Sequence, residues 1–285
     1  MARVAIITDS ASDLTPELAS SAGIAVVPLI VTFGGEEFKA GVDLSTDQFW
    51  ERMLAPDAPF PTTAAAAPGA FKETYEAAFA GGAEAIVSVH VAATLSGTMD
   101  AARIGASMLE GREIHLVDSG SASMAVGLLA MLGAELATAG VSAPEIARVL
   151  EARKADVDLY AALDTLEYLK RGGRISGPRA AVGSLLSIKP IITVIHGKVD
   201  TADRVRTRGK ARERVTELLT QRKVERLAIL FTPPADPEAF RDEVIARLPG
   251  GIDPARVFVY AVGSSVGPHL GPGCLGGVFL AASGD

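Results

Sequence analysis

The sequence predicts an α/β protein of two domains: a three-layer N-terminal domain with a parallel sheet, residues 1–158, and a C-terminal α+β domain, residues 159–285. In the first half, short apolar runs alternate with amphipathic stretches, a pattern typical of a parallel sheet covered by helices on both faces. The second half has a hairpin signal and a less regular order of elements. A chain of 285 residues, 48% of them hydrophobic, is long enough to bury two such cores.

Strands and helices alternate from the first residues to about residue 154. Short apolar runs predict buried strands at residues 4–8, 24–33, 85–90 and 114–117. Pro28 marks an edge or a bulge in the second run, because proline cannot donate a hydrogen bond to a sheet. Amphipathic stretches with helix start signals predict helices at residues 15–21, 45–53, 68–79, 97–109, 123–139 and 143–154.

The second half predicts a smaller set of elements with a hairpin among them. Two strands, residues 190–195 and 198–201, flank His196-Gly197, which has the composition of a hairpin turn. The remaining elements are strands at 159–163 and 227–231, helices at 166–170, 210–221 and 237–247, and a last clear strand at 257–261.

Composition and charge exclude several function classes. The net charge of −7 argues against a nucleic-acid or membrane-surface binder. The single cysteine, Cys274, cannot form an internal disulfide, which fits a reducing cytoplasm. The first apolar run is too short for a signal peptide, and no stretch has the pattern of a membrane-spanning helix. We therefore expect a cytoplasmic protein with no integral membrane segment and no nucleic-acid partner.

Two hydroxyl-bearing segments precede predicted helices. One is Leu95-Ser96-Gly97-Thr98 and the other, in an upstream loop, is Pro61-Thr62-Thr63. Gly97 allows a ligand to approach the backbone closely, and the N–H groups at a helix start attract anions. Thr63 and Ser96 are therefore candidates for binding a carboxylate or a phosphate. An ordinary helix cap at Ser96 and a plain turn residue at Thr63 remain the alternatives.

The titratable residues offer few further candidates. None of the four histidines, His90, His115, His196 and His269, stands at metal-ligand spacing with another histidine or with the cysteine, so we expect no metal. His269 lies in a Gly/Pro loop, where a ring nitrogen can donate to an anion. Asp9 directly follows the first strand, where it either caps a helix, belongs to a structural loop or contacts a ligand.

Two glycine patterns resemble enzyme motifs but stand in the wrong context. Residues 263–267 match a nucleophile elbow around Ser265, yet loop residues follow instead of a helix. Residues 271–276 match a dinucleotide fingerprint, yet no strand directly precedes them, so we expect a tight loop there. A stand-alone serine esterase acting through Ser265 or Ser96 is therefore the alternative hypothesis, and we expect no catalytic residue.

Positive charge is concentrated in one part of this acidic chain. A solvated face is the ordinary interpretation of such a cluster, and a surface that faces a phosphate or a partner is the alternative. The residues are Arg171, Arg174, Arg179, Arg204, Arg206, Arg208 and Lys210.

A series of short motifs, in order along nearly the whole chain, resembles the DegV family of fatty-acid-binding proteins. The motifs are Thr8-Asp9-Ser10, Pro61-Thr62-Thr63, Leu95-Ser96-Gly97-Thr98, Val117-Asp118-Ser119, the segment 166–175, Ile188-Lys189-Pro190, Arg206-Thr207-Arg208 and Gly267-Pro268-His269.

The resemblance implies a fold, a ligand and a partner. Members have two α/β domains that hold a long-chain, palmitate-like fatty acid, and they serve a bacterial fatty acid kinase in phospholipid metabolism. By resemblance, Thr63, Ser96 with Gly97, and His269 bind the carboxylate. The kinase subunit transfers phosphate from ATP to that carboxylate, which gives an acyl phosphate. Arg171, Arg174 and Arg206 would then lie on the side that the kinase approaches.

The sequence departs from the family pattern in two places. Residues 64–67 are four alanines where the family has a polar Ser-Gln-Pro-Ser segment, and Ala92-Ala93 replace a common serine pair. These changes remove side-chain hydrogen bonds near the head group and leave the backbone N–H groups. A binder of another small anion is therefore a further alternative to the fatty-acid carrier.

Overall fold

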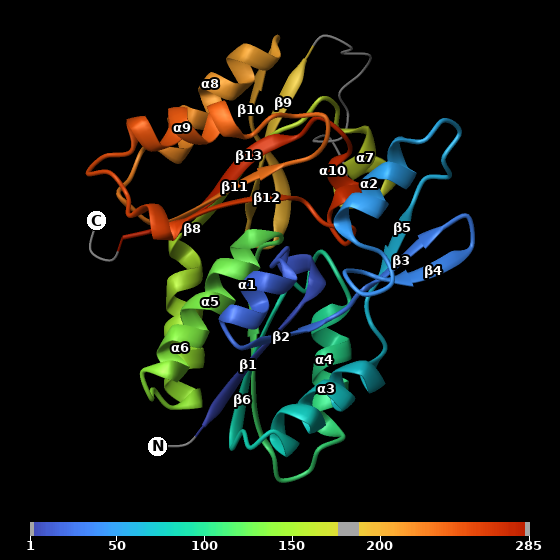
Figure 1. Ribbon diagram of the computed structural model, residues 1–285, viewed down its shortest axis with the longest axis vertical. Helices are drawn as coiled ribbons and strands as arrows, with labels where there is room; N and C mark the ends of the chain where they lie inside the picture. The colour runs from blue at the N-terminus through green and yellow to red at the C-terminus, as the bar shows by residue number, and fades with distance from the viewer. Residues whose placement is uncertain (1–2, 176–187, 283–285) are drawn as a thin grey trace.

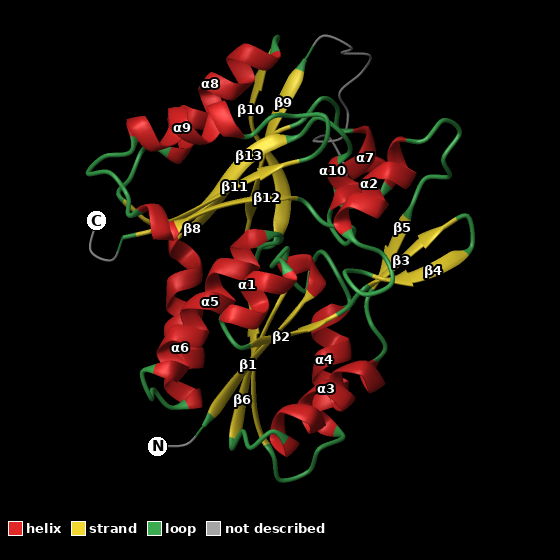
Figure 2. Cartoon of the chain, in the orientation of Figure 1, coloured by secondary structure: helices red, strands yellow, loops and turns green. Residues whose placement is uncertain are grey.

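The computed structural model describes residues 3–175 and 188–282. Two main sheets, of four and six strands, are stacked with a helix between them, and a three-stranded sheet lies to one side (Figure 1). Figure 2 shows the remaining helices around these sheets. The predicted α/β class, with a parallel sheet and a separate sheet-rich region, is confirmed. The domain boundary after residue 158 falls within β8, the first strand of the six-stranded sheet, and stays a prediction.

The four-stranded sheet is entirely parallel, in the order β2-β1-β6-β7. Helices cover both of its faces, which makes the predicted three layers (Figure 1). Its strands are β1 (Val4–Asp9), β2 (Ile24–Val27), β6 (Ala85–His90) and β7 (Glu113–Asp118). Its helices are α1 (Pro16–Ser21), α3 (Pro68–Ala80), α4 (Thr98–Ser107), α5 (Met124–Thr138) and α6 (Ala143–Arg153).

Helix α5 joins the two main sheets. Its sequence is apolar almost all round, as expected of a helix buried on every side. It contacts β1 and β6 of the first sheet and β8 and β13 of the second. One hydrophobic core therefore runs from the parallel sheet, through α5, to the inner face of the six-stranded sheet.

The prediction of one strand at residues 24–33 is wrong, because two strands lie there. The chain breaks at Pro28, which has no N–H, and the N–H of Leu29 donates to Ser10 Oγ instead of to a strand. The second strand starts a three-stranded antiparallel sheet, β4-β3-β5, that the sequence did not predict. The strands are β3 (Ile30–Phe33), β4 (Glu36–Lys39) and β5 (Thr62–Ala64).

The six-stranded sheet is mixed, in the order β10-β9-β8-β13-β11-β12. The predicted hairpin between β9 and β10 is confirmed, with His196 and Gly197 both at positive φ, as a tight two-residue turn requires. Helix α8 covers the outer face and packs against α9. The strands are β8 (Val157–Ala162), β9 (Lys189–Ile195), β10 (Lys198–Val205), β11 (Val224–Phe231), β12 (Val257–Ala261) and β13 (Leu275–Ala281).

The prediction that the last clear strand ends at residue 261 is wrong. β13 follows it and lies in the middle of the six-stranded sheet, antiparallel to β8 and to β11. Two consecutive glycines made this strand resemble a loop. At Gly276 an added Cβ would lie 2.3 Å from the carbonyl oxygen of Tyr160, so only glycine fits beside the neighbouring strand.

The other helices connect these sheets. α2 begins with a capping box formed by Ser45 and Gln48 and packs beside the three-stranded sheet. The helices are α2 (Thr46–Leu54), α7 (Glu167–Arg171), α8 (Arg208–Leu219), α9 (Glu238–Arg247) and α10 (Gly267–Leu270). The described residues also include three short 3-10 turns: η1 (Ser10–Ser12), η2 (Lys154–Asp156) and η4 (Pro254–Arg256).

Candidate functional site

A mostly apolar cavity lies between the parallel-sheet region and the inner face of the six-stranded sheet. About 810 Å³ of space free of protein atoms lies between these walls, part of it open solvent. Aliphatic side chains alternate along the sheet strands and point into it. They include Leu159, Ala161, Ile192, Val194, Val199 and Leu230.

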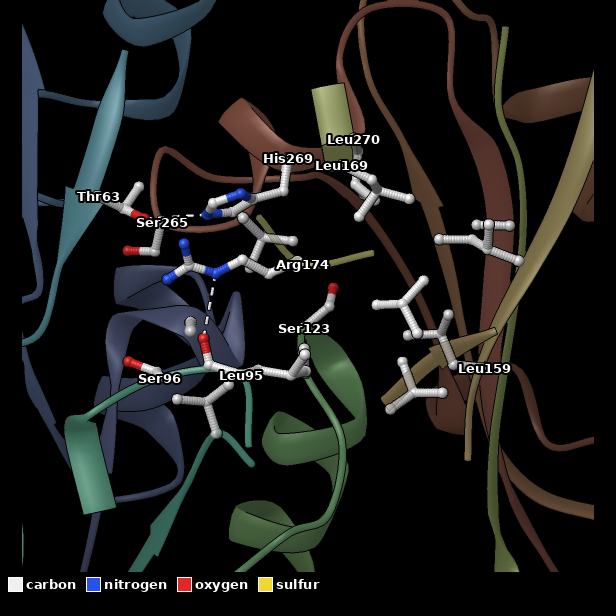
Figure 3. A pocket seen from close by; sticks show the side chains of 18 of the residues that line it. Thr63, Leu95, Ser96, Ser123, Leu159, Leu169, Arg174, Ser265, His269 and Leu270 are labelled. Carbon is white, nitrogen blue, oxygen red and sulfur yellow. Dashed lines mark hydrogen bonds between the residues drawn. The ribbon is translucent and has the colours of Figure 1, made fainter. Parts of the chain in front are cut away.

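Polar side chains gather at one end of this cavity. Figure 3 shows Thr63, Ser96, Arg174, Ser265 and His269 together there, with Leu159 on the far side. They come from β5, from the loop after β6, from the segment after α7 and from the region of α10. The structure therefore brings together three of the predicted ligand-binding residues, Thr63, Ser96 and His269.

Thr63 lies on a strand, which corrects the expectation of a loop. It pairs with Val31 in the register of β3 and β5, so the sheet fixes where its side chain points. A hydrogen bond of 2.9 Å joins its Oγ1 to Nε2 of His269 (Figure 3). The strand and the histidine together hold the hydroxyl at the polar end of the cavity.

His269 is neutral at physiological pH. Burial, together with the positive charge of Arg174, lowers its pKa to about 4. Its Nδ1 has no hydrogen-bond partner among the described residues and packs against Gly172, where an added Cβ would lie only 2.2 Å away. We place the ring proton on Nε2, because an N–H at Nδ1 would be left buried and unpaired. Nε2 then donates to Thr63 Oγ1, and the Thr63 hydroxyl proton is free to donate into the cavity.

Ser96 stands just before α4 without acting as its N-cap. The N-cap is Gly97, which has no side-chain cap. Ser96 Oγ accepts from the N–H of Thr98 at 3.3 Å and lies 2.7 Å from the Thr98 hydroxyl. Gly97 itself does not line the apolar cavity and faces a hollow outside it. Ser96 belongs to both spaces.

Arg174 is the one charged side chain among the described residues that line the apolar cavity. A Schellman motif places it: the N–H of Arg174 donates to Leu169 and that of Gly173 to Lys170, with Gly173 at φ 71°. Its guanidinium donates to the carbonyl oxygens of Leu95, at 3.1 Å, and Gly172. It pairs with no carboxylate among residues 3–175 and 188–282, and desolvation lowers its pKa.

The placement of Arg174 differs from the docking role that the sequence suggested. Half-buried in the cavity wall, it faces the ligand space, whereas Arg171 and Arg206 are exposed. Arg171 lies over the ring of Phe60, 4.0 Å from the centroid. Arg179, another member of the predicted basic cluster, lies outside the described residues.

A second polar cluster lies deeper, where the parallel-sheet region meets the six-stranded sheet. Asp13 Oδ1 accepts from the N–H of Gly263 at 2.9 Å, and Oδ2 accepts from the Ser123 hydroxyl at 2.6 Å. Because that proton is used, the Tyr260 hydroxyl donates to Ser123, at 3.0 Å, and itself accepts from the N–H of Met124. Burial raises the pKa of Asp13 to about 7, against the lowering effect of these hydrogen bonds.

The nucleophile-elbow pattern does not form a hydrolase site. Ser265 Oγ lies 2.8 Å from Ser10 Oγ, and the ring of His269 bonds to Thr63. A serine nucleophile needs a base within hydrogen-bond reach, and the Ser10 hydroxyl beside Ser265 is not a base. The arrangement gives no support to an esterase that acts through Ser265.

Asp9 and His90 are structural. Asp9 caps the 3-10 turn η1 by accepting from the N–H of Ala11, whereas the predicted helix that starts at Pro16 is capped by Thr15. Its other carboxylate oxygen accepts from the N–H of Val91 and is 3.0 Å from Nδ1 of His90. His90 Nε2 lies 2.7 Å from Ser88 Oγ, and Asp9, Ser88 and His90 are all fully buried.

Nearly the whole chain matches one known protein family. The DegV family model, described as an uncharacterised protein of the DegV family, matches residues 3–282. The chain belongs to the DegV family. It is 37% identical over 277 residues to a DegV domain-containing protein of Deinococcus radiodurans, covering 96% of each chain. It is also 37% identical to a relative in Streptomyces coelicolor, again with 96% of each covered.

Solved DegV structures share the fold. A DegV family protein from Thermus thermophilus, described as fatty-acid binding, superposes with a TM-score of 0.87 at 32% identity, covering 98% of this chain and 100% of its own. DegV of Bacillus subtilis, described as a fatty-acid-binding protein, has a TM-score of 0.85 at 30% identity, covering 98% and 99%. The family resemblance seen in the motifs is thereby confirmed.

Two negative observations concern the described residues of this DegV chain. Within residues 3–175 and 188–282, no three His, Cys, Asp or Glu side chains are grouped as a metal site would need. In the same residues no helix has the length and apolar character to cross a membrane.

Sequence reasoning missed the place of two residues in this DegV site. The charge pattern predicts a surface cluster that includes Arg174, although the Gly-Gly pair before it is the signal of a helix C-cap. The sequence predicts Ser123 only as the first residue of a helix. It has φ 58° and lines the cavity, and nothing in its sequence context indicates either property.

Proposed function

We propose that this DegV protein binds a long-chain fatty acid, with the acyl tail in the apolar cavity and the carboxylate at its polar end. The observation that carries the proposal is Arg174, which lies at the polar end of a mostly apolar cavity. Among the described residues it is the one charged side chain in the cavity wall, and none of their carboxylates pairs with it. A buried charge is costly unless it is paired, so the cavity suits a ligand with one negative head and a long apolar tail.

The energetics support such a ligand. Burial of a sixteen-carbon tail at about 0.8 kcal/mol per CH₂ contributes on the order of 12 kcal/mol before the costs of association. The head group then needs hydrogen bonds. Arg174, the hydroxyl of Thr63 oriented by His269, and Ser96 supply donors for a carboxylate, without the polar residues that the alanines at 64–67 replace.

The first test is mass spectrometry of the purified protein, native and then denatured, followed by analysis of the organic extract. We expect a native mass excess of one long-chain fatty acid that is lost on denaturation and recovered as free acid. A protein that carries no lipid and takes up none of several fatty acids would contradict the proposal. Another anion in the native complex would favour the small-anion alternative.

We also propose that the bound carboxylate is presented to a fatty acid kinase in the cytoplasm, where it is phosphorylated to an acyl phosphate for phospholipid metabolism. The DegV chain then acts as a carrier, and the catalysis belongs to the kinase. Exposed Arg171 and Arg206 are the candidates for kinase docking, since Arg174 faces the cavity.

Replacement of Arg206 by alanine tests the docking role. We expect unchanged fatty-acid affinity and at least a fivefold slower phosphorylation of the bound acid by the partner kinase, because an exposed charge acts mainly on encounter. Arg103→Ala removes an exposed arginine of α4 that pairs with Asp100 and serves as the control. Equal rates for Arg206→Ala and wild type would remove Arg206 from the docking surface.

A further inference from the structure

One polar side chain lies in the wall of the acyl cavity away from its polar end. In Figure 3 the Ser123 side chain extends from the start of α5 into the space between the polar end and Leu159. Apart from Ser123 and the five residues of the polar end, every described residue in this wall is aliphatic. Among the described residues, Ser123 therefore supplies the one hydroxyl that faces the part of the cavity assigned to the acyl tail.

The backbone of Ser123 has an unusual conformation for a residue with a side chain. Its φ of 58° and ψ of −151° belong to a region that is populated almost only by glycine. Helix α5 makes no use of the side chain, because Ser123 is its N-cap and forms no side-chain cap hydrogen bond. Strain of this kind persists only where the surrounding structure fixes a residue. Here it accompanies a hydroxyl that is placed between Asp13 and the cavity.

The hydrogen bonds of Ser123 leave one position of its oxygen open. Its proton is donated to Asp13 Oδ2, and one of its two lone pairs accepts from the Tyr260 hydroxyl. Asp13 and Tyr260 stand behind Ser123 and do not line the cavity. No described residue donates to the second lone pair. Ser123 therefore presents an acceptor, and no donor, to the tail of a bound ligand.

An acceptor in the wall changes which acyl chains the cavity can hold. A hydroxyl group that is buried among aliphatic side chains is costly unless it forms a hydrogen bond, and Ser123 offers the acceptor that it needs. A ketone oxygen has no proton to donate, so it would face another lone pair and stay unpaired. An unsubstituted tail loses nothing, because Ser123 is already bonded to Asp13 and Tyr260.

We propose that Ser123 is a specificity-determining residue that lets the cavity bind hydroxylated long-chain fatty acids, by accepting a hydrogen bond from a hydroxyl on the acyl tail. This inference rests on the proposed fatty-acid site, since the carboxylate at the polar end holds the tail in the cavity. Asp13 is a positioning residue, because its carboxylate takes the Ser123 proton and so makes Ser123 an acceptor toward the ligand. The cavity then selects hydroxy acids over the matching keto acids.

The experiment compares stearic acid with hydroxystearic and ketostearic acids that carry the oxygen at the same mid-chain carbons. Affinities are measured by displacement of a fluorescent fatty acid at about pH 8.5, where Asp13, with a pKa of about 7, is ionised. At the carbon that lies beside Ser123, wild type should bind the hydroxy acid at least tenfold more tightly than the keto acid. Equal affinity for the two acids at every carbon would overturn the inference.

Two variants test the two residues separately. Ser123→Gly removes the hydroxyl and suits the positive φ, and the preference for the hydroxy acid should fall below about threefold. In Asp13→Asn the amide Nδ2 donates to Ser123, whose own proton then turns toward the cavity, so the keto acid should become the tighter ligand. A preference that persists in Ser123→Gly overturns the inference, and one that persists in Asp13→Asn overturns the positioning role of Asp13.

Ser119→Gly is the matched control, because it removes a buried serine hydroxyl that does not line the cavity, and it should keep the wild-type preference. Stearic acid itself should bind wild type and all three variants with affinities within about threefold of one another, since its tail makes no hydrogen bond. Failure of wild type to bind stearic acid would reject the proposed function. Stearic acid binding without any preference for hydroxy acids would reject only the role of Ser123.

Discussion

Two polar clusters, one at the polar end of the cavity and one deeper in the protein, differ in how completely their groups are paired. In the deep cluster, Asp13, Ser123 and Tyr260 form a hydrogen-bonded chain in which every hydroxyl proton has an acceptor within the protein. At the polar end, no described residue supplies a carboxylate to Arg174 or an acceptor to the Thr63 hydroxyl proton. Buried polar groups are normally paired, so the pairing of the first cluster indicates a structural role, and the free donors of the second fit the proposed ligand.

This comparison separates stability from binding in each cluster. Substitutions in the deep cluster should lower the free energy of unfolding and leave ligand affinity of the folded protein largely unchanged. Substitutions at the polar end should weaken ligand binding and leave the free energy of unfolding largely unchanged, because residues kept for binding contribute little to stability. The single tryptophan, Trp50, donates from Nε1 to the carbonyl oxygen of Val262, and its fluorescence is a convenient probe of unfolding.

The largest expected effect concerns the pH dependence contributed by Asp13. Its pKa is about 7 in the folded protein and near 3.8 when exposed, so the folded state binds more protons between these values. Stability from this group is therefore present at low pH and is lost as pH rises from about 4 to 7, on the order of 4 kcal/mol in all. Asp13→Asn cannot titrate and should lack this contribution.

Urea unfolding at several pH values measures the contribution of Asp13 to the free energy of unfolding. The free energy of unfolding of wild type minus that of Asp13→Asn should decrease from pH 4 to pH 7 and level off above. His269 has a lowered pKa and therefore the opposite sign, with stability rising as pH increases from about 4 to 6.5. Because His269 is present in both wild type and Asp13→Asn, its contribution cancels when the two free energies of unfolding are subtracted. Parallel curves would show that Asp13 is ionised in the fold.

The next effect is at Arg174. Arg174→Met keeps the aliphatic stem and removes the charge, and a hydrogen bond to a charged group contributes about 1.5–3 kcal/mol. We expect a 10- to 100-fold loss of fatty-acid affinity, measured by displacement of a fluorescent fatty acid, with a nearly unchanged free energy of unfolding. Arg206→Met is the control at an exposed site. Unchanged fatty-acid affinity in Arg174→Met would contradict a role of Arg174 in lipid binding and would favour a role in kinase docking.

The smallest effects belong to the neutral donors. Thr63→Val is nearly isosteric and removes one hydrogen bond to the head group, as does Ser96→Ala, so each should weaken binding by about 1–2 kcal/mol. A long-chain alcohol, which carries no charge, should be affected less than the acid. If neither variant changes affinity for the acid, the carboxylate lies elsewhere in the cavity.

Most of the fold could be predicted from the sequence, because periodicity and start signals mark long elements. The strands β1, β6 and β7 and the helices on either side follow apolar runs and amphipathic stretches closely. Short strands were missed where pairing decides the structure. β5 has only three residues and exists because β3 lies beside it.

The candidate site could be predicted only in part, because short motifs indicate single residues and not which of them meet in the fold. The hydroxyls of Thr63 and Ser96 are recognisable from motifs, but nothing local indicates that they meet His269, which is some 206 residues from Thr63 in the chain. The role of Arg174 depends on the turn after α7 and on the missing carboxylate, neither of which a charge pattern contains. A contact between residues so far apart in the chain, such as Thr63 with His269, is a property of the folded protein and not of any local sequence pattern.

The central position of β13 has a consequence for synthesis. Strands β8 to β10 and strands β11 to β12 leave the ribosome before the strand that joins them. Until β13 arrives, the facing edges of β8 and β11 are unpaired, and exposed edges promote association with other chains. The nascent protein therefore carries two incomplete sheets until residues 275–281 have been translated, and their edges are open to pairing with other chains.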